Sequence, residues 1–214
     1  MKDSTQSFHF LSGEGDAWHD RNPLEIESVR FSPDIITISK ALDGVKNDIE
    51  KIVEIGCADG TKLKVLCETF DAKGFGIDPS LKATQRGNLL YGNDLELHQG
   101  LASSLPFGDK LADLVIFGFC LYLNDRETLV NAISEADRVL KNSGFMIITD
   151  FDPGHEIINK YQHKEGVFSF KEDYANHFLE KNYILLEKHS FSHFQDCIEM
   201  DINERVSTQI LLKP

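Results

Sequence analysis

The sequence has 214 residues, of which 41% are hydrophobic and 27% are charged, and its formal net charge is −13 at pH 7. This length suits one α/β domain with a full core and is too short for two independent domains. No apolar run approaches the roughly 20 residues that span a bilayer. The first residues lack the basic and apolar regions of a secretory signal, so we expect a cytoplasmic protein without membrane association.

The excess of acidic side chains also bears on the class of substrate. There are 35 acidic and 22 basic residues, and no segment is rich in lysine or arginine. A nucleic-acid substrate normally requires a basic patch against its phosphates. The charge therefore disfavours DNA or RNA, although a local patch could survive a negative total.

From residue 51 onward, short apolar runs alternate with amphipathic stretches, a pattern typical of parallel strands joined by helices. The predicted strands in this part of the chain span 51–56, 74–78, 95–99, 112–119 and 145–150. The predicted helices between them span 61–70, 79–91 and 124–140. Residues 112–119 are continuously apolar, as expected for a central strand buried on both faces, and Asn124 with Glu127 suggests a capping box.

The two ends of the chain complete the predicted fold. Residues 171–181 suggest a further helix, and residues 183–194 and 205–212 suggest two strands that pair antiparallel at the sheet edge. Residues 1–50 precede the first strand, and we expect them to form a helical cap with helices at 16–22 and 32–42. The sequence thus predicts a seven-stranded α/β sheet with helices on both faces.

A glycine-containing turn between the first predicted strand and helix carries the strongest functional signal. Residues 52–61 read IVEIGCADGT, which places Glu54, Gly56, Ala58 and Gly60 at alternate positions. Glycines let the backbone approach a ligand closely, and the helix N-terminus offers free N–H groups. A dinucleotide fingerprint requires G-x-G-x-x-G, so this order counts against a nicotinamide-dependent oxidoreductase. A tight turn that binds no ligand is the alternative.

Asp78 ends the second predicted strand about 20 residues after this turn, where an acid can accept hydrogen bonds from both hydroxyls of a ribose. Pro79 and Ser80 follow it, so Asp78 could instead cap the next helix. The two roles are compatible. Together with Glu54 and Gly56, Asp78 favours a nucleoside site.

These residues resemble motif I and the ribose-binding acid of the Rossmann-like S-adenosylmethionine-dependent methyltransferases. The turn is similar to [DE]-x-G-x-G-x-G, with Ala58 in place of the middle glycine. Residues 100–107, GLASSLPF, resemble the segment that lies against the adenine, with Leu101 where the family usually has an acid. Residues 112–123 resemble the strand and loop near the methionine amino group.

The resemblance implies a three-layer Rossmann-like fold, with a cap over residues 1–50 and an S-adenosylmethionine-binding domain over residues 51–214. It also implies S-adenosylmethionine as cofactor and S-adenosylhomocysteine as product. Because the sulfonium is already activated, the protein mainly has to align the nucleophile and exclude water. The residues that the resemblance places around the cofactor are Glu54, Gly56, Cys57, Ala58, Gly60, Asp78, Pro79, Leu101, Ala102 and Phe117.

Residues 13–22, GEGDAWHDRN, resemble a stretch that precedes the domain in methyltransferases from surface-polysaccharide and sugar-modifying gene sets. This resemblance implies that Trp18 and Arg21 close over the cofactor. Arg21 would meet the methionine carboxylate through its paired donors. An exposed helix with one packed aromatic ring is the alternative.

A polar segment follows the fifth predicted strand, and ligands bind beyond the carboxyl ends of parallel strands. Its DFDP and HKEGVFSFKEDY elements resemble the same sugar-associated group. The candidate catalytic residues here are His155, Tyr161 and His163, because a histidine can serve as general base for a hydroxyl or amine acceptor. Solvated surface residues are the alternative for each histidine.

No metal site is expected. The histidines at 155, 163 and 177 lack the short, regular spacing of a zinc site, and the four cysteines form no CxxC pair. The sequence therefore predicts an enzyme that methylates O or N of a small polar acceptor such as a sugar or nucleotide sugar. The alternatives are a catalytically inactive partner subunit that binds the cofactor, and an RNA methyltransferase, which the charge disfavours.

Overall fold

The core of the protein is a seven-stranded sheet in the order β3-β2-β1-β4-β5-β9-β8. The computed structural model describes residues 5–194 and 201–214. The first five strands are parallel: β1 Lys51–Ile55, β2 Lys73–Asp78, β3 Leu95–Gln99, β4 Ala112–Gly118 and β5 Leu140–Phe151. β9 (Arg205–Leu212) pairs antiparallel with both β5 and β8 (Ile184–Ser192). The predicted seven-stranded sheet and its antiparallel edge hairpin are confirmed.

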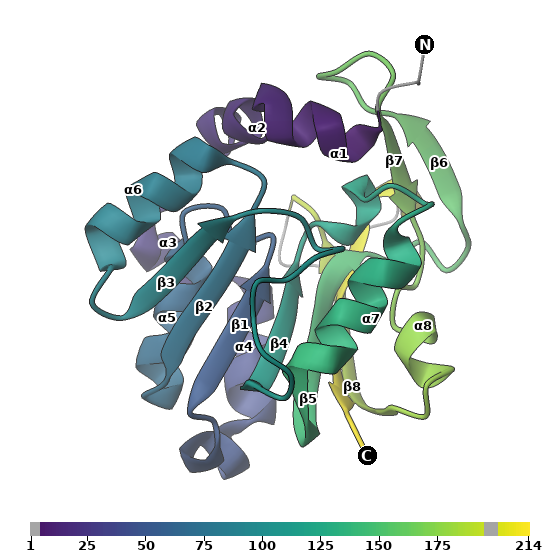
Figure 1. Ribbon diagram of the computed structural model, residues 1–214. Coiled ribbons are helices and arrows are strands. Elements are labelled where there is room, and N and C mark those ends of the chain that lie inside the picture. Colours follow the sequence, from purple (N-terminus) through teal and green to yellow (C-terminus); the bar gives the residue numbers. More distant parts are fainter. Residues whose placement is uncertain (1–4, 195–200) are drawn as a thin grey trace.

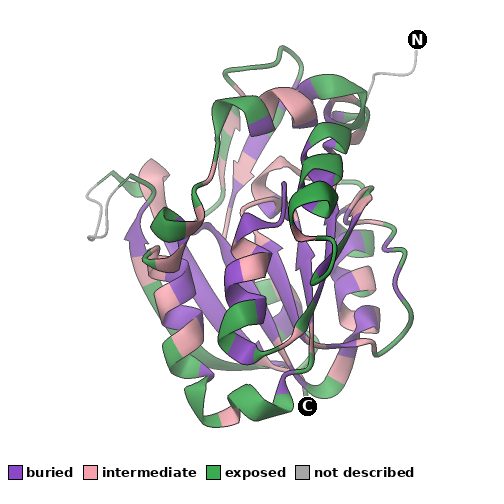
Figure 2. Cartoon of the chain, turned by 90° about the vertical axis from the view of Figure 1, so that its left-hand side faces the viewer, coloured by how far each residue is buried: buried purple, intermediate pink, exposed green. Residues whose placement is uncertain are grey.

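Helices cover both faces of the sheet (Figure 1). Successive strand side chains point to opposite faces, so each strand feeds two apolar cores. Val53 and Val115 pack in one core with α7 (Leu129–Val139), while Ile52 and Leu114 pack in the other. Figure 2 shows the buried strands between partly buried helices. The helices that pack on the second core are α3 (Ile26–Arg30), α4 (Pro33–Ala41), α5 (Thr61–Phe70) and α6 (Leu81–Tyr91).

Two predicted helices begin elsewhere in the structure. The helix predicted over 124–140 starts at Leu129, so the capping box at Asn124 and Glu127 is wrong. Residues before it form a short 3₁₀ turn, η3 (Leu121–Leu123), and a loop whose Asp125 carboxylate accepts hydrogen bonds from the N-terminal segment. The helix predicted from residue 79 starts at Leu81, because the Ser80 side chain caps it by accepting from the Ala83 N–H.

The helix predicted over 171–181 is also wrong over most of its length. β6 (Ile157–Lys160) pairs antiparallel with β7 (Phe168–Lys171), and only α8 (Asn176–Leu179) is helical. Lys171 belongs to β7, in which burial follows the period of two of a strand: Ser169 and Lys171 are buried while Phe168 is exposed. The β6–β7 hairpin stands beside the main sheet in Figure 1.

The N-terminal residues divide into two parts. α1 (Gln6–His9), the π-type turn η1 (Phe10–Glu14) and α2 (Gly15–Arg21) lie across the carboxyl ends of the strands (Figure 1). We call residues 5–21 the cap. The helices predicted at 16–22 and 32–42 correspond to α2 and α4, but α4 packs against the sheet rather than over the strand ends. Residues 1–4 of the predicted cap segment lie outside the described residues, as do residues 195–200.

No helix within the described residues combines the length and the apolar character that crossing a membrane requires.

Candidate active site

A pocket that is partly open to solvent lies between the carboxyl ends of the parallel strands and the cap. Its walls come from β1, β2 and β4, from the loop after β3 and from the cap. Six of the residues predicted to bind the cofactor line it: Trp18, Gly56, Asp78, Pro79, Leu101 and Ala102. We call this space the cofactor pocket.

The glycine turn that forms its floor has a left-handed backbone. Gly56, Ala58 and Gly60 have φ angles of 79°, 47° and 75°, and the left-handed conformation is unfavourable for an alanine. A Cβ atom at Gly56 would lie 2.6 Å from the Cβ of Cys120. Packing against Cys120 therefore requires a glycine here, whereas the sequence suggested only the close approach of a ligand.

Asp78 connects this turn to the start of α6. Its Oδ2 accepts from the Ala58 N–H at 2.9 Å, and its Oδ1 accepts from the Ser80 N–H at 2.8 Å. Each carboxylate oxygen has a second lone pair, so both can still accept from a ligand hydroxyl. Burial raises the pKa of Asp78 to about 6. The geometry thus allows the capping role and the ribose-binding role together.

Glu54 supplies a buried carboxyl group beside the same pocket. A Cβ atom on Gly118, which lines the pocket, would lie 2.7 Å from Glu54 Oε1. Glu54 Oε2 has no hydrogen-bond partner among the described residues. Burial raises the pKa of Glu54 to about 8. Buried polar groups normally have partners, so a ligand with N–H donors, such as an amino acid ammonium group, fits this position.

The remaining residues predicted to bind the cofactor lie behind or beside the pocket. Cys57 and Phe117 are buried in the two apolar cores, although Gly118 and Phe119 line the pocket next to Phe117. Gly60 precedes α5 as its N-cap. Arg21 forms an ion pair with Glu14 at 2.5 Å rather than lining the pocket.

Three sets of contacts hold the cap over the pocket, and the sequence predicted none of them. The Gln6 and Ser7 N–H groups donate to Asp125 at 2.7 and 2.9 Å. The Ser80 hydroxyl donates to Asp16 at 2.6 Å. Partners so distant along the chain leave no local pattern in the sequence. The third set joins Arg21 and the Tyr161 hydroxyl to Glu14.

A second, more open cavity lies between the β6–β7 hairpin and the ends of β5 and β9. Two of the predicted catalytic residues, Tyr161 and His163, line it, with their ring centroids 5.3 Å apart. His155 is exposed in the turn before β6 and lines neither space. Burial, with the neighbouring Glu14, raises the pKa of Tyr161 to about 12. We call this space the acceptor cavity, after the role that we propose for it.

A group of aromatic rings, the aromatic wall, separates the two spaces. Phe119 lines the cofactor pocket, and its ring centroid lies 6.1 Å from Tyr122, 5.3 Å from Phe151 and 5.3 Å from His193. These three partners line the acceptor cavity. Phe119 has a φ of 57°, and such backbone strain in a non-glycine residue is concentrated at functional sites.

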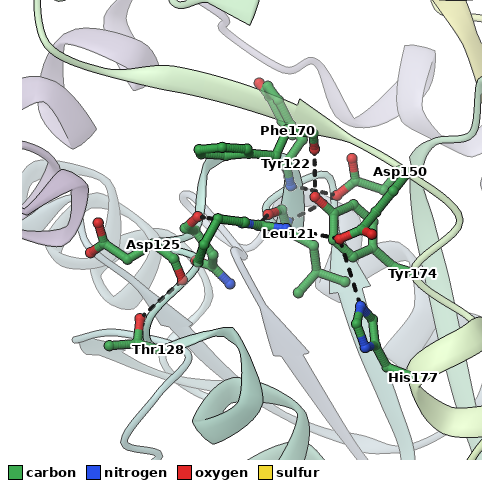
Figure 3. Close-up of polar contacts among 11 residues, drawn as sticks. Leu121, Tyr122, Asp125, Thr128, Asp150, Phe170, Tyr174 and His177 are labelled. Atoms are coloured by element: carbon green, nitrogen blue, oxygen red, sulfur yellow. Dashed lines mark hydrogen bonds and ion pairs between the residues drawn. The ribbon is translucent and has the colours of Figure 1, made fainter. Parts of the chain in front are cut away.

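Asp150 fixes the position of the wall, and the sequence reasoning did not identify this role. Its Oδ2 accepts from the Leu121 N–H at 2.9 Å and the Tyr122 N–H at 3.4 Å (Figure 3). Burial raises the pKa of Asp150 to about 7. Arg126 donates to the Leu121 carbonyl at 2.8 Å and to Glu172 at 2.8 Å. The turn that carries Tyr122 is thereby tied to both β5 and the segment after β7.

Residues 53–148 match the family model described as a methyltransferase domain. This range begins within β1, ends within β5, and holds the glycine turn and Asp78. Residues 53–148 form a class I S-adenosylmethionine-dependent methyltransferase domain. S-adenosylmethionine is accordingly the cofactor of this methyltransferase. The carboxylate oxygens of Asp78 and Glu54 are acceptors that suit its ribose hydroxyls and its ammonium group.

Solved structures share the fold of the methyltransferase. The 1,6-didemethyltoxoflavin-N1-methyltransferase of Burkholderia thailandensis is 10% identical, with a TM-score of 0.71 over 95% of this chain and 86% of that one. A chain from the complex of the Haloferax volcanii Trm112 methyltransferase activator with a putative methyltransferase is 19% identical, with a TM-score of 0.69 over 95% and 97%. The N-methyltransferase NodS of Bradyrhizobium japonicum WM9 is 15% identical, with a TM-score of 0.59 over 87% and 91%. None of the curated proteins matches the sequence.

Proposed function

We propose that the methyltransferase transfers the methyl group to an oxygen or nitrogen atom of a small polar acceptor, with sugars and nucleotide sugars as the first class to test. The observation that carries this proposal is the acceptor cavity, which adjoins the cofactor pocket across the aromatic wall. Phe119 has one space on each side. Methyl transfer requires direct contact between the nucleophile and the methyl group, so the acceptor has to reach past the edge of Phe119.

The chain's own residues have separable tasks in this scheme. Asp78 accepts from the ribose hydroxyls and Glu54 accepts from the methionine ammonium group, while the cap excludes water. Bound S-adenosylmethionine supplies an activated methyl group. His163 is our candidate general base, because it lines the acceptor cavity. Tyr161 has a raised pKa and is held by Arg21 and Glu14, so it suits holding the cap better than taking a proton.

Other observations favour a small acceptor. Two of the structures with the same fold are named as an N1-methyltransferase of 1,6-didemethyltoxoflavin and as an N-methyltransferase. The net charge of −13 disfavours RNA. A cofactor-binding partner subunit without its own activity would not require a second cavity beside the cofactor pocket. One of the structures with the same fold comes from a complex with a methyltransferase activator. A role for a partner protein is therefore the second candidate to test.

The test combines an acceptor screen with a histidine variant. Isotope-labelled S-adenosylmethionine is incubated with sugars, nucleotide sugars and RNA, and label transfer is detected by mass spectrometry. With the acceptor that is found, His163→Ala should lower turnover about 10²–10⁴-fold, the usual effect of losing a general base. The affinity for S-adenosylhomocysteine should stay within a factor of two or so.

His155→Ala is the matched control, because this exposed histidine precedes the same hairpin but lies outside both spaces. Normal turnover of His163→Ala would show that another group takes the proton. Label transfer to RNA alone would overturn the small-acceptor proposal. Cofactor binding without transfer to any acceptor would favour the partner-subunit alternative.

A further inference from the structure

The acceptor cavity contains a buried lysine, Lys171, that has no role in the methyl transfer proposed so far. Lys171 ends β7, and only 7% of its surface is exposed. Its ammonium group donates to the Asn203 carbonyl and lies 3.6 Å from the centroid of the Phe151 ring. Glu204 Oε1 forms an ion pair with it at 3.8 Å, which is longer than a hydrogen bond. An ammonium group has three N–H donors, so Lys171 retains donors for a ligand in the cavity.

The charge of the cavity differs from that of the whole chain. Acidic residues outnumber basic ones by 35 to 22 in the sequence. Among the described residues that line the cavity, however, Glu204 is the one carboxylate, whereas there are two lysines, Lys160 and Lys171. Burial lowers the pKa of His193, so this histidine adds no charge at neutral pH. A locally cationic cavity in an acidic protein is a site that attracts anions.

The electrostatics of Lys171 agree with this reading. Burial lowers the pKa of Lys171, and the nearby Glu204, Asp201 and Asp150 oppose that effect without cancelling it. Burying an ammonium group is unfavourable unless it is paired. The existing acids therefore offset the cost of burying the ammonium group only in part, and a bound anion would offset more of it.

We propose that the acceptor carries an acidic group, a carboxylate or a phosphate, that binds the Lys171 ammonium group while its nucleophile faces the cofactor pocket. This inference rests on the proposed function. It follows from the order of groups across the site: Lys171 lies on the Phe151 ring, Phe151 contacts Phe119, and Phe119 lines the cofactor pocket. An acceptor that bridges the aromatic wall is thus anionic at one end and methylated at the other. Uronic acids and sugar phosphates have this chemistry.

Binding of simple anions tests the site without knowledge of the acceptor. Benzoate and inorganic phosphate are titrated into the protein saturated with S-adenosylhomocysteine, and the melting temperature is followed. We expect one or both to stabilise the wild type. In Lys171→Met the apparent affinity should fall about 10- to 100-fold, as for the loss of a hydrogen bond between charged groups. Lys171→Arg, which keeps the charge, should recover part of it.

Lys164→Met is the matched control, because Lys164 is exposed on the same hairpin and does not line the cavity. Circular dichroism checks that each variant folds. The proposal is overturned if neither anion stabilises the wild type, or if Lys171→Met and Lys164→Met respond alike.

Methyl transfer to matched pairs then separates the two possible acids. Glucuronate and glucose 6-phosphate are each compared with glucose, and a preference for one acid identifies the carboxylate or the phosphate. A preference for neutral glucose that Lys171→Met leaves unchanged would overturn the acidic-acceptor inference but leave the proposed methyl transfer intact. Anion binding at Lys171 without transfer to any acceptor would instead contradict the proposed function.

Discussion

Asp78 is the residue in which local folding and ligand recognition coincide. It ends a strand, accepts two backbone N–H groups and lines the cofactor pocket. The strained turn at Ala58 is stabilised by the same carboxylate that we expect to bind the ribose. Gly56 shows the complementary case, because its lack of a side chain serves packing against Cys120.

Replacing Asp78 by Asn should weaken binding of S-adenosylhomocysteine by about 1.5–3 kcal/mol, since an amide offers one acceptor oxygen in place of two charged ones. Calorimetry measures this loss. In the wild type the affinity should also fall as the pH drops through about 6, the pKa of Asp78, because protonation removes an acceptor. The variant should lose this pH dependence. Equal affinities at pH 7 would show that the ribose lies elsewhere, and binding of NAD in place of the sulfur compounds would reverse the cofactor assignment.

At the scale of elements, the cap is joined to three different parts of the domain. It contacts the loop before α7 through Asp125, the start of α6 through Ser80, and the β6–β7 hairpin through Tyr161. The cofactor pocket lies beneath it. Entry and release of the cofactor therefore require some of these contacts to open.

Asp125→Ala should release α1, because it removes the acceptor of the Gln6 and Ser7 N–H groups. We expect S-adenosylhomocysteine to dissociate about tenfold faster, a conservative share of the free energy of two charge-assisted hydrogen bonds. Stopped-flow displacement measures this rate. Glu127→Ala, in the same loop but exposed, is the control. An unchanged dissociation rate would mean that the cap does not limit release.

Elements also show where local pattern was a poor guide. The sequence suggested a helix over residues 171–181, yet Lys171 completes β7 against β6 and the helix is confined to α8. The loop before α7 is shaped by its bond to the cap, and its polar residues mimic a capping box. In both cases a tertiary partner decided the structure over local preference.

Over the whole molecule, three buried carboxyl groups lie at or near the ends of parallel strands. Burial raises the pKa of Glu54 to about 8, of Asp78 to about 6 and of Asp150 to about 7. A carboxyl whose pKa is higher in the folded state favours folding when protonated. This contribution is complete below the unfolded pKa and is lost as the pH rises through the folded value. Ionisation of these carboxyl groups therefore lowers the stability of the ligand-free fold, while it provides hydrogen-bond acceptors at or near the site.

Glu54→Gln should weaken the pH dependence of the unfolding free energy, because glutamine cannot ionise. Between about pH 5 and pH 8.5, the wild type should lose about 1–3 kcal/mol more unfolding free energy than the variant. Urea unfolding without cofactor at the two pH values measures the difference. Glu127→Gln, an exposed change, should behave as the wild type does. Parallel losses in wild type and Glu54→Gln would show that Glu54 stays in one ionisation state across this range.

The sequence by itself determined the parts of this protein that are local in the chain. The strands β1 to β5, the glycine turn and Asp78 lie within one continuous stretch, where apolar periodicity and glycine position report directly on backbone structure. The methyltransferase domain and its cofactor followed from them.

Only the tertiary structure decided how the acceptor cavity is built. Tyr122, Phe151, Lys171 and Asn203 come from four separate segments, and no spacing rule relates them. The same holds for Asp16 beside Ser80 and for Gln6 beside Asp125. Such contacts arise because the sheet order brings distant loops to one edge, where burial then sets the charge state of each group.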